Sequence, residues 1–143
     1  MISSPNPGKI TGPEELRQRT KQFALRIIKL FRALPKTEEA RILGRQILRS
    51  GTAVAANYRS ACRARSRADF ISKIGIVVEE ADETVFWLEL LSDAGIVRKD
   101  RLEDLLTEAN ELVRIFAASR ETAKSRRAIT NQKSPITNYV CSC

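Results

Sequence analysis

The sequence predicts an all-α protein, an antiparallel up-down four-helix bundle. Hydrophobic residues recur at alternating spacings of three and four along four segments, which is the periodicity of helices that share a core. Glycine and proline are scarce, with 6 and 5 residues among 143, and this favours long uninterrupted helices. No segment shows the alternation of a strand. The links between the four segments are short, which makes consecutive helices antiparallel neighbours.

The hydrophobic content of 43% and the charged content of 29% are typical of one folded domain. We expect a flexible N-terminal segment over residues 1–12, the bundle over residues 13–125, and a disordered tail over residues 126–143. The predicted helices cover residues 13–34, 37–63, 66–93 and 99–125.

The first helix begins at Pro13, where proline suits the first helical position, and Glu14 and Glu15 follow near the positive end of the helix dipole. Pro35 ends it. Its predicted core residues are Leu16, Thr20, Phe23, Ile27, Leu30 and Leu34.

The second helix is capped by Thr37, with two acids in its first turn. Small residues such as Gly44 and Gly51 lie along it and predict the close approach of a neighbouring helix. Its predicted core residues are Leu43, Ile47, Ser50, Val54, Asn57 and Ala61.

The third helix is capped by Ser66 with Asp69 three residues later, a start that resembles a capping box. It is apolar well beyond one stripe, so we expect it to lie in a crowded position. Asp100 opens the fourth helix. The predicted core residues are Phe70, Ile74, Val77, Ala81, Thr84, Leu88 and Leu91 in the third helix, and Leu102, Leu105, Leu106, Ala109, Leu112, Val113 and Phe116 in the fourth.

The composition argues against an enzyme. The chain has no histidine, the commonest general base and metal ligand, and it has no phosphate-binding loop or dinucleotide fingerprint. Cys62 is expected to be a packing residue, and Cys141 and Cys143 are too few for a structural zinc site. Glu80 flanks the third core stripe, and we interpret it as a buried ion-pair partner rather than part of a carboxylate metal site. We therefore predict no catalytic residues, no metal and no cofactor.

Charge is unevenly distributed along a chain whose formal net charge is +8. Residues 1–67 carry +11, residues 68–97 carry −6 and residues 98–143 carry +3. The basic balance favours a polyanionic partner. No signal peptide and no membrane-spanning apolar run is recognisable, so we expect a cytoplasmic protein with no membrane partner.

The strongest functional signal is a run of arginines along the second helix. Between Ala40 and Ala68 there is no acidic residue and no lysine. We name the seven arginines of this run the arginine stripe: Arg41, Arg45, Arg49, Arg59, Arg63, Arg65 and Arg67. Six of them form two i, i+4, i+8 series, which a continuous helix would display on one face opposite the core, although Arg67 lies near the predicted helix end.

Three interpretations of this stripe remain open. Arginine forks match phosphate oxygens, so RNA or DNA is the favoured partner. Alternatively, the stripe receives the acidic outer face of the third helix of a neighbouring copy, where Glu79, Glu83, Phe86 and Leu90 are the expected interface residues. Asp82, Glu89 and Asp93 lie on the same acidic face. The third interpretation is a merely solvated face.

Residues 43–97 resemble the four-helix-bundle proteins encoded within intervening sequences of bacterial 23S rRNA genes, and the likeness extends over about 110 residues. The matching pieces are Arg49-Ser50-Gly51-Thr52, Ala56-Asn57-Tyr58-Arg59, the Arg63–Arg67 link, Phe70-Ile71-Ser72-Lys73, Glu79-Glu80-Ala81-Asp82-Glu83-Thr84 and Trp87-Leu88-Glu89-Leu90-Leu91. The chain departs from the family pattern at Ser60, where glutamate is usual, and at Ala55, where glycine is usual.

The resemblance implies a bundle that assembles as a homo-oligomeric ring, characteristically a pentamer, without catalytic residues. Its relatives include the accessory protein of diversity-generating retroelements, which works with a reverse transcriptase and RNA. Together, residues and resemblance predict a non-enzymatic adaptor associated with nucleic acid, with RNA favoured and ribosomal RNA or a reverse transcriptase as possible partners. The alternative is a homo-oligomeric interaction scaffold with no direct nucleic-acid binding.

Overall fold

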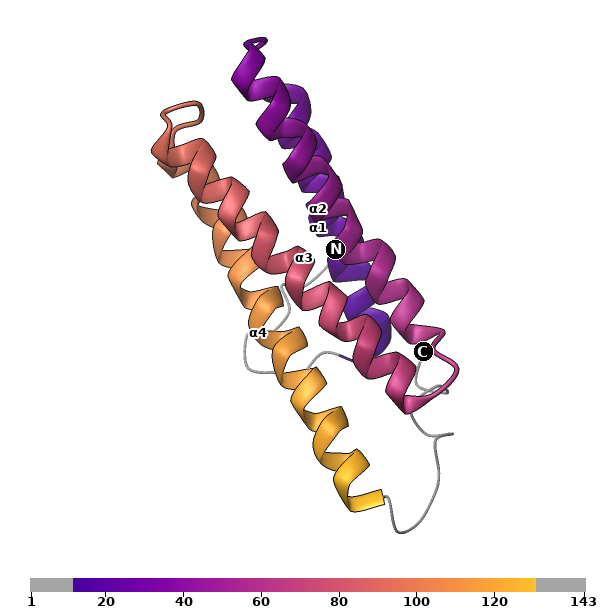
Figure 1. Ribbon diagram of the computed structural model, residues 1–143. Helices are drawn as coiled ribbons and strands as arrows, with labels where there is room; N and C mark the ends of the chain where they lie inside the picture. The colour runs from indigo at the N-terminus through magenta and orange to yellow at the C-terminus, as the bar shows by residue number, and fades with distance from the viewer. Residues whose placement is uncertain (1–11, 131–143) are drawn as a thin grey trace, which may run out of the picture.

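Four long helices in sequence order make up the described part of the chain, residues 12–130 of a computed structural model. They are α1 (Pro13–Ala33), α2 (Glu38–Cys62), α3 (Arg67–Asp93) and α4 (Lys99–Thr130). Figure 1 shows two antiparallel helix pairs, α1 with α2 and α3 with α4, joined by the link between α2 and α3. The described residues contain no strand, and the predicted all-α bundle is confirmed.

The helix starts follow the sequence signals. The Thr37 hydroxyl accepts a hydrogen bond from the Ala40 amide at 3.3 Å, and the Ser66 hydroxyl accepts one from the Asp69 amide at 3.0 Å. Gly95 follows α3 with a φ of 71°, a left-handed conformation that glycine adopts without strain. α4 extends to Thr130, five residues past the predicted end. The expectations of a flexible N-terminal segment and a disordered tail otherwise fall on residues 1–11 and 131–143, outside the described residues.

α3 occupies the crowded position that its apolar sequence predicts. It packs against both α2 and α4, whereas α1 and α4 touch at only a few places. All seven of its predicted core residues are buried. Phe116 of α4 is fully buried and reaches Tyr58 of α2, with the ring centroids 4.9 Å apart. The core is thus continuous across the bundle.

The small residues of α2 allow the close approach of α1. A Cβ atom on Gly51 would lie 2.7 Å from Cγ1 of Ile27, a side chain with no exposed surface. A Cβ atom on Gly44 would lie 2.7 Å from Cδ1 of Leu34. The predicted close neighbour of α2 is therefore α1, and glycine is required where the two helices come closest.

One polar pair fixes the level of α2 against α3. The hydroxyls of Ser50 and Thr84 lie 2.9 Å apart in the buried core. Both residues have no exposed surface, and the Thr84 hydroxyl is also 2.8 Å from the Glu80 carbonyl. Because the two helices are antiparallel, a residue one position later in α2 lies level with a residue one position earlier in α3.

Candidate nucleic-acid interface

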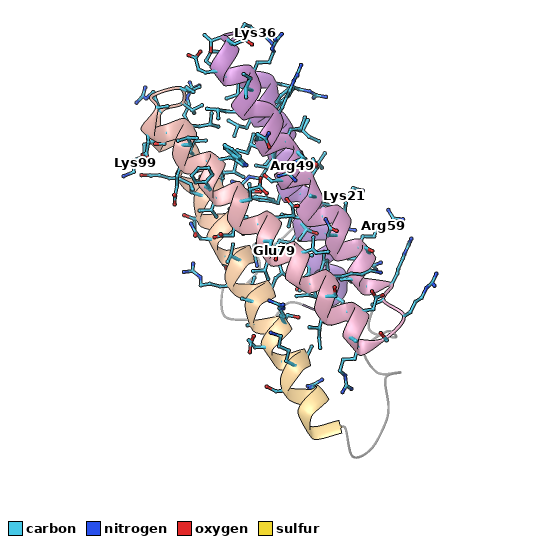
Figure 2. All side chains as sticks on the ribbon, viewed as in Figure 1. Lys21, Lys36, Arg49, Arg59, Glu79 and Lys99 are labelled. Carbon is cyan, nitrogen blue, oxygen red and sulfur yellow. The ribbon has the colours of Figure 1, made fainter. Side chains whose placement is uncertain are left out.

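Three members of the arginine stripe stand on the outward face of α2. Arg41, Arg45 and Arg59 are exposed, whereas the core residues Ile47 and Val54 on the opposite face have no exposed surface. Figure 2 shows Arg59 projecting from the bundle. Arg41 lies 3.7 Å from Glu38, and both side chains are largely exposed. Solvent weakens such a pair, so Arg41 keeps most of its capacity to bind an anion.

Arg63 and Arg65 lie in the link between α2 and α3, and the link holds both outward. Burial alternates along it, because Cys62 and Ala64 are buried and the two arginines are exposed. The Ala64 amide donates to the Ala61 carbonyl at 3.0 Å, and the Arg65 amide donates to the Asp69 carboxylate at 3.1 Å. These bonds make the link a fixed corner rather than a loose loop.

Arg67 does not belong to the exposed face, and the expectation of a solvent-displayed side chain there is wrong. α2 ends at Cys62, so the helical period that aligns the stripe does not continue across the link. Arg67 is instead the first residue of α3, with only 9% of its surface exposed.

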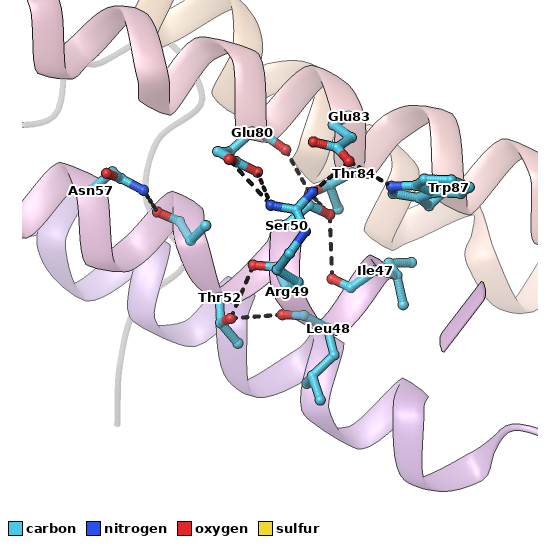
Figure 3. A network of polar contacts seen from close by, with 11 residues as sticks. Ile47, Leu48, Arg49, Ser50, Thr52, Asn57, Glu80, Glu83, Thr84 and Trp87 are labelled. Carbon is cyan, nitrogen blue, oxygen red and sulfur yellow. Dashed lines mark hydrogen bonds and ion pairs between the residues drawn. The ribbon is translucent and has the colours of Figure 1, made fainter. Parts of the chain in front are cut away.

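Arg49 is also different from its neighbours, because it is engaged within the chain. Figure 3 shows its guanidinium between two carboxylates of α3. Nη1 donates to Glu80 at 3.1 Å and Nη2 donates to Glu83 at 2.5 Å. Glu83 also accepts a hydrogen bond from the Trp87 indole at 3.1 Å. The interpretation of Glu80 as an ion-pair partner agrees with this geometry, since its side chain is only 19% exposed.

Arg49 and Glu83 shift each other's pKa in the directions expected of an ion pair. The hydrogen bond from Arg49 lowers the pKa of Glu83 below its ordinary value of 4.5, and the Trp87 hydrogen bond adds to the effect. The hydrogen bond to Glu83 raises the pKa of Arg49 in turn. The ionised Glu83 therefore stabilises the fold at pH values above its unfolded-state pKa. This contribution is lost as the pH falls through its lower folded-state pKa.

We expect Arg49→Ala to lower the free energy of unfolding at neutral pH by about 1 kcal/mol, a small value because the Arg49 side chain is half exposed. Between neutral pH and about pH 3.5, the wild type should lose more stability than the variant. Urea unfolding at both pH values, followed by the fluorescence of the single tryptophan, measures both effects. Arg41→Ala is the control, and a variant with an unchanged pH profile would contradict the role of the network.

The outer face of α3 carries the residues expected at an interface between copies. Glu79 and Phe86 are exposed, and Phe86 has 52% of its surface in solvent with its ring stacked edge-on against Trp87 at 4.9 Å. Leu90, which was expected to be exposed on this outer face, is partly buried. The carboxylate of Glu83 is bound to Arg49 of the same chain, because α2 brings Arg49 within reach, and is not free for a neighbouring copy.

The sequence did not single out two further features. Ile42 is 52% exposed within the arginine stripe, next to Arg41, and a helical projection centred on Ile47 would have placed it outward. Arg19 of α1 bridges to α4 and donates to Glu108 at 2.6 Å, with Glu111 at 3.2 Å. The hydrogen bond to Glu108 raises the pKa of Arg19. No sequence signal pairs Arg19 with Glu108, since 89 residues separate them.

Neither a metal site nor a membrane span is found among the described residues. No group of three or more histidine, cysteine, aspartate or glutamate side chains lies close enough there to hold a metal ion. No helix in that part of the chain combines the length and the apolar character needed to cross a bilayer. Cys141 and Cys143 lie outside it.

Fold and surface together define a basic four-helix bundle whose second helix displays arginine. The profile of the 23S rRNA-intervening sequence protein family matches residues 14–118, and the chain belongs to this family. No curated protein matches. A crystal structure of a protein of unknown function from the S23 ribosomal protein family, from Bacteroides thetaiotaomicron, is 34% identical with a TM-score of 0.72. The match covers 76% of this chain and 97% of that chain.

Proposed function

We propose that the protein is a non-enzymatic adaptor that binds RNA through the outward arginines of α2 and of the link that follows it. The observation that carries this proposal is the exposure of Arg41, Arg45 and Arg59 on the outward face of α2 and of Arg63 in the link. No acidic residue lies between Ala40 and Ala68 to neutralise them. Repulsion between like charges at i, i+4 costs a few tenths of a kcal/mol per pair, and a bound polyanion would offset that cost.

The family name favours RNA over DNA as the polyanion, because it refers to 23S rRNA. Ribosomal RNA is accordingly the first ligand to test. Binding through arginine and phosphate releases counterions, so the logarithm of the affinity should fall linearly with the logarithm of the salt concentration. A scaffold without nucleic-acid affinity would show no such dependence.

We expect labelled RNA transcribed from a 23S rRNA gene to bind the wild type, and Arg45→Glu with Arg63→Glu to weaken this binding at least about tenfold. Fluorescence anisotropy at about 50 and 200 mM salt measures both affinities. Lys99→Glu with Arg101→Glu is the matched control, since it changes the net charge equally at exposed positions at the start of α4. If the variant with Arg45→Glu and Arg63→Glu binds the RNA as tightly as the wild type does, the proposal is refuted.

A second candidate, a self-associating scaffold, is favoured by the outer face of α3. Phe86 offers an exposed aromatic anchor, and Glu79, Asp82 and Glu89 surround it with exposed acids. This face is complementary in charge to the outward face of α2, so a head-to-tail contact between copies would use two different surfaces, and it forms a ring where the rotation between copies closes. Light scattering at micromolar concentration tests it: a monomer contradicts the scaffold, whereas a pentamer is the mass that the family resemblance leads us to expect.

A further inference from the structure

We infer that the arginine stripe is divided between two partners, and that RNA contacts only the cluster at the link between α2 and α3. We name Arg59, Arg63 and Arg65 the corner cluster, and Arg41 and Arg45 the distal pair. The inference rests on the proposed RNA-binding function. It adds which arginines touch phosphate, and it leaves the distal pair to a second copy of the chain.

A gap along α2 separates the distal pair from the corner cluster. Arg49 stands between them along α2, but its guanidinium is held by Glu80 and Glu83. Beyond it, the outward position Ala56 carries no charge. Arg59 and Arg63 follow Arg41 and Arg45, respectively, by 18 residues, which is about 27 Å along a helix. The stripe is therefore two separate basic groups rather than one continuous surface.

The acidic residues of α3 lie at the same height along the bundle as the distal pair of α2. The pair of Ser50 and Thr84 places position n of α2 level with about position 134 − n of α3. On this scale the distal pair is level with residues 89–93, within the acidic segment 79–93 of α3. In a closed ring every copy stands at the same height along the symmetry axis. For bundles aligned with that axis, the acidic segment of one copy meets the distal pair of the next.

Apolar residues match at the same level. Ile42 lies beside Arg41 with 52% of its surface exposed, and it is nearly level with Leu90 and within about two helical turns of Phe86. The pattern of an apolar anchor surrounded by opposite charges thus occurs on both faces, as expected of complementary interface patches. Arg41 and Arg45 would become covered when the copies assemble.

The corner cluster has no such counterpart. Arg59 and Arg63 are level with positions 75 and 71 of α3, which lie before the first residue of the acidic segment, Glu79, and Asp69 is the acid of that helix nearest to the level of Arg63. Its carboxylate already accepts the Arg65 amide and lies 3.1 Å from the Lys73 ammonium. These hydrogen bonds, the backbone one first, lower the pKa of Asp69. Assembly through the acidic segment would therefore leave the corner cluster in solvent at one end of every copy.

The corner is also suited to phosphate by its rigidity. Buried Ala64 fixes the direction of the flanking Arg63 and Arg65, so less side-chain and backbone freedom is lost when they bind. The N-terminus of α3 begins at the same corner and adds its positive dipole end. In a ring, the corners of all copies would form one basic rim on which RNA contacts add up.

The test compares three double variants that lower the net charge equally. The corner variant is Arg59→Glu with Arg63→Glu, the distal variant is Arg41→Glu with Arg45→Glu, and the control is Lys99→Glu with Arg101→Glu. Each is measured for molar mass by light scattering, for helix content by circular dichroism, and for binding of an RNA of about ten nucleotides, short enough for one protomer.

We expect the corner variant to keep the wild-type mass and to bind RNA at least about tenfold more weakly, with a slope of log affinity against log salt that is shallower by about 2. The distal variant should have a lower mass and an unchanged slope. Arg59→Gln with Arg63→Gln should reproduce the shallower slope, which excludes an effect of the introduced acids. Adding Glu89→Arg to the distal variant should restore its mass.

Three results would overturn the inference. Wild-type RNA binding by the corner variant, with loss in the distal variant, would assign RNA to the distal pair and leave the proposed function intact. A wild type that binds no RNA at any salt concentration would refute the proposed function together with the inference. A distal variant of wild-type mass would remove the second copy from Arg41 and Arg45 and contradict the division of the stripe.

Discussion

Replacing Phe116 with alanine should lower the free energy of unfolding by about 3–5 kcal/mol. Phe116 has no exposed surface, and its ring contacts Tyr58 across the bundle. α4 contacts α1 at few places, the Arg19 ion pairs among them, so its apolar packing is against α3 and, through this contact, against α2. The substitution removes a large buried side chain at the point that joins α4 to the far helix pair, and the surrounding helices cannot collapse fully into the cavity.

Thermal and urea unfolding followed by circular dichroism measure this loss. Phe86→Ala is the matched control, because the same atoms are removed from a ring that is half exposed. It should cost less than about 1 kcal/mol, provided that all samples have the same mass by light scattering. Equal losses in the two variants would show that Phe116 does not carry the core between α4 and α2.

The second large effect is expected at the contact between α1 and α2. Gly51→Val should destabilise the protein by about 3 kcal/mol, because its Cβ would overlap the Ile27 side chain and no free volume is available there. The overlap reaches Cβ of Ile27, at 3.1 Å, and this atom cannot move without the α1 backbone. The helix propensity gained by removing glycine, about 1 kcal/mol for alanine and less for valine, is too small to offset this.

Ala56→Val provides the control on the exposed side of the same helix, where valine costs only its lower helix propensity, about half a kcal/mol. Ile27→Ala introduced with Gly51→Val should recover part of the loss, since the smaller side chain makes room for valine. A double-mutant cycle in urea isolates that coupling. Strictly additive losses would mean that the two residues are not in contact.

The helices themselves were predictable from the sequence because their signals are local. Thr37 and Ser66 cap the helices that follow them, and the core stripe of α3 is buried at each predicted position from Phe70 to Leu91. A side chain that recurs every three or four residues on a helix can only lie on one face, and burial of that face is the main gain in free energy. The family resemblance, which rests on the segment from α2 to α3, is confirmed as well.

The surface was less predictable, because the state of a charged side chain depends on a partner helix. Arg45 and Arg49 lie one helical turn apart on α2, and the sequence pattern of the stripe does not distinguish them. Only the packing of α3 brings Glu80 and Glu83 to Arg49. Arg67 follows the i, i+4 series of the stripe but lies beyond the end of α2, so its side chain is buried at the start of α3.

The sequence by itself determined that the chain is a basic bundle of four helices, where the four helices begin to within one residue, and which faces form the core, since all of these depend on residues a few positions apart. Only the tertiary structure decided which arginines remain exposed. That outcome depends on contacts between helices far apart in the sequence, which set the level of Arg49 against Glu80 and Glu83 and turned the link at Ala64 so that Arg63 and Arg65 face the solvent.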